Sequence, residues 1–131
     1  METEVSSTLV AELLAVAEAG HPQEVCGLLL GESDRISDVR PCANVHPCPH
    51  THFEIDPRAL IAAHRAAREG GMQVVGYYHS HPFGPPEPSA TDRAEATGDG
   101  RVWAIIGEGR VGWWRDEIEG FAPLSYASSD G

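Results

Sequence analysis

A short apolar run that ends in glycine, VCGLLLG at residues 25–31, restricts the possible folds of this chain more than any other feature. It is too short to span a membrane, and its length and composition are typical of a buried strand. Further strands are expected at residues 36–45, 53–55 and 74–78, with an edge strand at 118–126. The runs 102–106 and 111–115 flank the glycine turn GEGR, which predicts a β-hairpin.

Helices are expected between these strands, at residues 7–19, 57–69 and 89–97. The first has its apolar residues on one helical stripe, and Ser6 or Ser7 is suited to be its N-cap. Asp56 followed by Pro57 is a typical start for the second, which the glycine pair at 70–71 ends. Strands alternate with helices early and form hairpins late, which predicts an α/β fold: a mixed sheet with helices on both sides.

Length and composition favour one soluble domain. The chain has 131 residues, without repeats or a linker, so residues 1–131 are expected to form a single domain with a core at about 5–125 and a loose SSDG tail. The N-terminus lacks the basic segment of a signal peptide, and we expect a cytoplasmic protein. Three cysteines without C-x-x-C spacing argue against a disulfide framework and a zinc ribbon.

The net charge of the chain limits the kinds of molecule that it can bind. Nine arginines, no lysine and 20 acidic residues give a net charge of −11. This disfavours nucleic acid and anionic membranes, and suits a cationic partner surface or a solubilising role.

The segment GYYHSHPFGPPEPSATD at residues 76–92 carries the most chemical information. His79 and His81 are two apart at the end of a predicted strand, so both side chains point to the same face. Pro82 ends that strand, which we expect to place the pair at a sheet edge. The proline-rich loop can fold Asp92 back toward them. Two histidines and one carboxylate are the ligand set of a catalytic zinc that keeps a fourth position open.

Each of these residues also has a simpler interpretation. A lone His-x-His pair is commonly an ordinary loop pair, and Ser89 with Asp92 three residues later resembles a helix-capping box. By position alone, Glu24 is a solvated residue at a strand end. A second group of possible metal ligands, His46, Cys48, His50 and His52, lies among prolines that favour a loose surface loop. Trp113 and Trp114 should face opposite ways on their strand.

Taken together, these motifs resemble the JAMM (MPN-plus) metallopeptidase family. His79-Ser80-His81-Pro82, six residues, then Ser89-x-x-Asp92 matches the family's metal-binding signature. The stretch EVCGLLLG from Glu24 matches its upstream glutamate and strand, and FEIDP at residues 53–57 its strand-to-helix junction. The likeness covers roughly residues 5–125. A zinc nucleoside deaminase would need H-x-E and P-C-x-x-C, but Cys42 and Cys48 lack that spacing and His81 is followed by Pro82 and Phe83. An H-E-x-x-H peptidase is excluded, because no such motif occurs.

The resemblance implies a cytidine-deaminase-like JAB/MPN fold with a curved mixed sheet, and one Zn²⁺ per chain. His79, His81 and Asp92 match the zinc ligands, Glu24 the base that acts on the zinc-bound water, and Ser89 the residue that stabilises the oxyanion. The implied reaction is hydrolysis of an amide bond by a peptidase or isopeptidase. The alternative is a non-catalytic MPN-type scaffold with a vestigial metal site.

The family also suggests a substrate. The chain is too short for the long insertions by which eukaryotic deubiquitinases hold ubiquitin. Small bacterial-type members act on ubiquitin-like sulfur-carrier proteins, so we expect cleavage after a C-terminal Gly-Gly tail. The leaving group and the oligomeric state stay open, a homodimer included.

Overall fold

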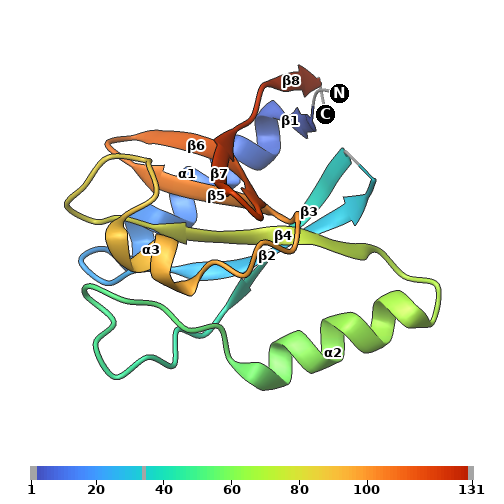
Figure 1. The fold of residues 1–131 in the computed structure, drawn as a ribbon, viewed down its shortest axis with the longest axis horizontal. Coiled ribbons are helices and arrows are strands. Elements are labelled where there is room, and N and C mark those ends of the chain that lie inside the picture. The colour runs from blue at the N-terminus through green and yellow to red at the C-terminus, as the bar shows by residue number, and fades with distance from the viewer. Residues whose placement is uncertain (1–2, 34, 130–131) are drawn as a thin grey trace.

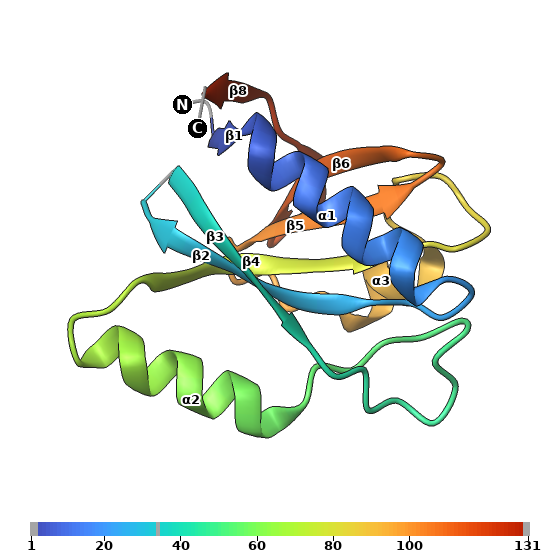
Figure 2. The same cartoon turned by 180° about the vertical axis from the view of Figure 1, so that it is seen from behind.

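The computed structural model describes residues 3–33 and 35–129, without the side chains of 127–129. Its centre is a curled sheet of eight strands in the order β7-β6-β5-β4-β2-β3-β1-β8 (Figures 1 and 2). The strands are β1 Thr3–Ser6, β2 Cys26–Glu32, β3 Arg35–Cys42, β4 Gln73–Ser80, β5 Val102–Gly107, β6 Arg110–Glu117, β7 Gly120–Pro123 and β8 Tyr126–Ser129. The helices are α1 Ser7–Gly20, α2 Pro57–Arg68 and α3 Ala90–Glu95.

The sheet is mixed, as the sequence predicts. β2 runs antiparallel to its neighbours β3 and β4, β4 and β5 are parallel, and β5 and β6 form the expected hairpin. Glu108 and Gly109 in the hairpin turn both have positive φ, which matches the right-handed twist of paired strands. Because β4 has a partner strand on each side, it lies in the interior of the sheet.

The apolar run of β2 has helices on both of its faces. Leu29 points to one side, where Leu9 and Leu13 of α1 complete a cluster. Its neighbours Leu28 and Leu30 point to the other side, into a cluster with α2. Figures 1 and 2 show the two helices on opposite sides of the strands. The expected sheet with helices on both sides is therefore confirmed.

The helix starts follow the predicted capping chemistry. Ser6 is the N-cap of α1, and its hydroxyl accepts a hydrogen bond from the Leu9 N–H. Asp56 is the N-cap of α2, with its carboxylate accepting from the Arg58 N–H. These contacts satisfy backbone donors that a helix start otherwise leaves unpaired.

Three expectations about the strands are wrong. Residues 53–55 do not form a strand, and only one bridge links Ile55 to Asn44. Ser128 and Ser129 are not loose, because β8 pairs in parallel with β1, a strand that the sequence did not reveal; Asp130 and Gly131 lie outside the described residues. His79 is not at a sheet edge, because β4 lies between β2 and β5. A proline after a strand ends that strand but does not remove its neighbours on either side.

Within the described part of the chain, no helix is long and apolar enough to cross a membrane.

Close packing between β4 and β5 gives a test of the fold. A side chain on Gly76 of β4 would overlap the main-chain oxygen of Val102. We expect Gly76→Ala to lower the free energy of unfolding by about 1–3 kcal/mol, the usual range for overpacking. Gly84→Ala is the control, because its new methyl group would make only ordinary contact with His81. Denaturant unfolding measures both, and an equal effect of the two changes would contradict the packing argument.

Candidate metal centre and active-site cleft

The two histidines of the signature lie at the end of the interior strand β4. His79 is fully buried between Cys26 of β2 and Ile105 of β5. His81 follows the strand, and its N–H donates to the Ile106 carbonyl at 2.7 Å. The Nε2 atoms of the two rings lie 3.2 Å apart, as the two-residue spacing predicts.

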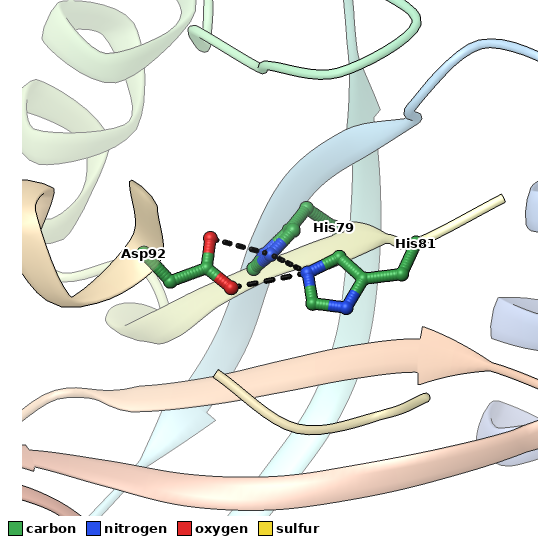
Figure 3. Close-up of side chains that lie close together, drawn as sticks. All are labelled: His79, His81 and Asp92. Atoms are coloured by element: carbon green, nitrogen blue, oxygen red, sulfur yellow. Dashed lines mark hydrogen bonds and ion pairs between the residues drawn. The ribbon is translucent and has the colours of Figure 1, made fainter. Parts of the chain in front are cut away.

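Asp92 reaches the histidines from the first turn of α3 (Figure 3). Its Oδ1 lies 3.0 Å from His79 Nε2, and its Oδ2 lies 3.0 Å from His81 Nε2. The capping box is present: the Ser89 hydroxyl accepts from the Asp92 N–H at 3.0 Å, and Asp92 Oδ2 accepts from the Ser89 N–H at 2.9 Å. Capping therefore fixes the carboxylate that faces the two rings.

The loop before α3 is held against the sheet. The Trp114 indole donates to the Pro86 carbonyl at 3.1 Å, while Trp113 on the opposite face is buried in the core. The two tryptophans therefore face opposite ways, as predicted. His81 Nδ1 lies 2.8 Å from the carbonyl oxygen of Pro85, and this contact also joins the loop to the end of β4.

The three side chains fit a small tetrahedral metal ion. Among the described residues they are the only group of three or more acidic, histidine or cysteine side chains close enough to share an ion. Zinc at about 2.0–2.1 Å from tetrahedral ligands needs ligand atoms about 3.3 Å apart. The observed separations of 3.0–3.2 Å are close to this value. The Pro85 carbonyl accepts a hydrogen bond from the His81 Nδ1–H, which leaves the His81 Nε2 lone pair for a metal.

His79 is held by aromatic packing instead. The Phe53 ring stacks on it with centroids 4.2 Å apart, and Trp103 meets its edge at 5.7 Å. His79 Nδ1 is buried and has no hydrogen-bond partner among the described residues. The sequence did not point to these aromatic contacts. The only signal for Phe53 was its place in the family's strand-to-helix junction.

The charges of the cluster depend on one another. Burial alone would raise the pKa of Asp92, but hydrogen bonds from His79 and His81 hold it well below the ordinary value. Burial lowers the pKa of His79. Burial also acts to lower the pKa of His81, but the hydrogen bonds to Asp92 and the Pro85 carbonyl outweigh it and raise the value. A carboxylate that stays ionised and a neutral His79 are the protonation states that a metal needs.

Glu24 is buried beside this cluster, just before β2, with 8% of its surface exposed. Burial raises its pKa to about 7; the charge of His81 opposes this shift and that of Asp92 adds to it. The residue is therefore not the solvated strand end that its position alone suggested. A carboxyl group that titrates near neutral pH is suited to acid–base chemistry.

Glu24 and Asp92 lie in the wall of a cleft of about 500 Å³. The loop at 46–52 contributes His46 and His52, whose rings stack with centroids 4.7 Å apart. The full lining is Glu24, His46, Thr51, His52, Phe53, Glu54, Ile55, Pro57, Leu60, Tyr77, Thr91, Asp92, Glu95, Thr97, Asp99, Trp103 and Asp116. Cys48 and His50 are exposed, and none of the four loop residues proposed as a second metal group joins the cluster.

Comparison with known proteins identifies the family. Residues 6–116 match the model for prokaryotic homologs of the JAB domain. The chain belongs to this family. It is thus a small prokaryotic member of the JAMM (MPN-plus) group, as the sequence resemblance indicated.

Individual relatives agree with this assignment. The chain is 40% identical over 112 residues to a desampylase of Haloferax volcanii, covering 81% of this chain and 78% of that protein. It is 43% identical over 75 residues to a probable TtuB-protein conjugate cleaving protease of Thermus thermophilus, covering 57% and 50% of the two chains. The solution structure of protein DSY2949 from Desulfitobacterium hafniense has the same fold, with a TM-score of 0.84, 28% identity and coverage of 98% and 93%.

Metal binding can be tested directly. We expect about one zinc ion per chain, and loss of the ion in His79→Ala and Asp92→Ala because each removes a donor atom from the cluster. His50→Ala is the matched control, since His50 is exposed outside it. Metal analysis after dialysis, with chelator competition, measures retention. Loss of zinc from the control but not from His79→Ala would show that the metal binds in the loop at 46–52 instead.

The pKa of Glu24 predicts a pH-dependent stability of the metal-free protein. Its folded pKa of about 7 exceeds the usual 4.5, so the folded state becomes less stable relative to the unfolded state as pH rises between these values. We expect Glu24→Gln to raise the free energy of unfolding at pH 8 by about 1–3 kcal/mol, and the gain to vanish toward pH 4.5. Urea unfolding with chelator measures it, with exposed Glu54→Gln as control. A gain that is the same at all pH values would disprove this origin.

Proposed function

We propose that this protein is a zinc-dependent peptidase or isopeptidase that hydrolyses the amide bond after the C-terminal Gly-Gly of a ubiquitin-like, sulfur-carrier-type protein. The observation that carries the proposal is the position of the His79, His81 and Asp92 cluster beside buried Glu24 at one cleft. The names of the relatives agree with it: one is a desampylase and another a conjugate-cleaving protease.

The donor set favours zinc. Two imidazoles and one carboxylate suit this ion, and three protein ligands leave one position for water. When bound, zinc supplies Lewis-acid polarisation of the scissile carbonyl and lowers the pKa of water toward about 7. A non-catalytic scaffold is disfavoured, because such a protein has no need for a complete donor set with a buried carboxyl group beside it.

Two side chains of the protein then have defined tasks. Glu24 takes a proton from the attacking water and delivers it to the leaving amine, for which a pKa near neutral is suited. The Ser89 hydroxyl uses its oxygen to accept from the Asp92 N–H, which leaves its own hydrogen to donate to the developing oxyanion. Capping and catalysis are thus compatible roles for this residue.

The substrate follows from the surroundings of the cluster. A Gly-Gly tail can pass close to a buried centre because it carries no side chains that would clash. The tail cannot extend the sheet at β4, since β2 and β5 occupy both of its edges. The cleft lining includes Glu54, Glu95 and Asp99 but neither arginine nor lysine, which favours a cationic leaving portion such as a lysine-bearing segment.

Substitutions at Ser89 distinguish its catalytic role from its role as a helix cap. We expect Ser89→Ala to lower kcat by roughly 10²–10³, the scale for an oxyanion donor, and to cost about 1 kcal/mol of stability for the lost cap. Ser89→Thr keeps both the acceptor and the donor and should retain most of the activity. Steady-state kinetics and thermal unfolding measure the two effects. A lower melting temperature with an unchanged rate would leave only the cap.

The substrate class is tested with a carrier protein joined through its C-terminal Gly-Gly to a lysine side chain, beside a version ending in Ala-Ala. We expect rapid release from the first, little from the second, and a rate lower by roughly 10²–10⁴ in zinc-loaded Glu24→Gln. Mass spectrometry follows the products. Equal cleavage of both carriers would refute the tail specificity. Cleavage of neither, alongside rapid cleavage of unrelated peptides, would refute the carrier while leaving a zinc hydrolase.

A further inference from the structure

Asn44 is the centre of a hydrogen-bond network behind the cleft wall. Its Nδ2 donates to the Glu24 carbonyl at 2.9 Å and to the His52 carbonyl at 3.0 Å. Its Oδ1 accepts from the His46 N–H at 3.1 Å and the Glu54 N–H at 3.0 Å. A side-chain amide has two N–H donors and one oxygen with two lone pairs, so Asn44 is fully satisfied in this position.

The same network holds the main chain around Glu24 from other sides. The Glu24 N–H donates to the Pro49 carbonyl at 2.7 Å, which joins it to the loop at 46–52. The next residue, Val25, donates its N–H to the Ser80 hydroxyl at 2.9 Å and accepts from the Ser80 N–H at 3.1 Å. Ser80 stands between His79 and His81. The segment of Glu24 is therefore fixed to the cleft loop on one side and to the histidine strand on the other.

We propose that Asn44 is a positioning residue that holds the carboxyl group of Glu24 in its working place, by joining the Glu24 main chain and the His46–His52 wall of the cleft into one unit. This inference rests on the proposed function. Asn44 is not among the residues that line the cleft and is not one of the three metal-ligand candidates, so its effect on the rate passes through Glu24.

Among the residues that the structure describes, the two segments that Asn44 joins lack other main-chain partners at these points. Glu24 precedes β2, where its carbonyl has no strand partner, and an unpaired buried carbonyl is costly. Residues 44–55 are joined by a single bridge, so the ladder of a strand pair does not fix this wall either. One side chain supplies the missing bonds of both segments. Misplacing a reacting group by about 1 Å can cost roughly 10²-fold in rate, which sets the scale of the expected effect.

A double-mutant cycle tests the proposal on the full, zinc-loaded protein. Asn44→Ala removes all four bonds, whereas Asn44→Asp keeps the two bonds accepted from the His46 and Glu54 N–H groups and loses both donor bonds. We expect each to lower kcat by about 10–100-fold, with one zinc retained and KM changed by less than about threefold. In the Glu24→Gln background the same changes should lower kcat by less than about twofold, because the group that Asn44 positions is gone. Val45→Ala, a neighbouring exposed residue outside the cleft lining, is the control and should leave kcat unchanged.

Equal fold-losses in the two backgrounds would overturn the proposal, as would a loss that only follows the folded or zinc-loaded fraction. Hydrogen exchange supplies a measurement that needs no substrate. The Glu24 and Val25 amides should exchange at least about tenfold faster in Asn44→Ala than in wild type and Val45→Ala; unchanged exchange would overturn the proposal whatever the activity. A wild-type protein that cleaves no carrier conjugate would instead count against the proposed function, and the exchange comparison would still decide whether Asn44 holds Glu24.

Discussion

The contact of the Asp92 carboxylate with two imidazoles is the interaction around which the rest of the site is arranged. Each carboxylate oxygen lies 3.0 Å from one histidine Nε2. Burying a carboxylate without partners is expensive, and here its partners are two rings at the end of a strand in the interior of the sheet. The short helix α3 is therefore tied to the core by the same atoms that are suited to hold a metal. Stability and chemistry depend on one set of contacts.

The local placement of the site could be predicted because each step depends on neighbouring residues. His79 and His81 share a face through strand geometry, and Ser89 caps the helix that carries Asp92. The buried strand at residues 25–31 and the caps at Ser6 and Asp56 were likewise readable from short patterns. Each of these features needs only a few consecutive residues to specify it.

Features that depend on distant segments were not predictable. β1 is only four residues long, which is too short to show a clear strand pattern in the sequence. It is stabilised by pairing with β3 and β8, which come later in the chain. The stacking of Phe53 on His79 joins two segments that lie more than 20 residues apart in the chain. The burial of Glu24 arises in the same way, because the cleft that encloses it is formed by segments far apart in the chain. Position in the sequence therefore suggested a solvated residue where the fold creates a carboxyl group with a raised pKa.

The single bridge between Asn44 and Ile55 has a consequence for how such a protein can diversify. The donor atoms belong to the end of β4, the residue after it and α3, whereas one wall of the cleft is a loop without strand pairing beyond this bridge. Loops of this kind tolerate changes in length and composition that a central strand does not. Changing exposed side chains such as Cys48 and His50 in this loop would change the surroundings of the cleft while leaving Phe53 and the bonds of Asn44 in place. The same scaffold could in this way acquire new selectivity without rebuilding its reaction centre.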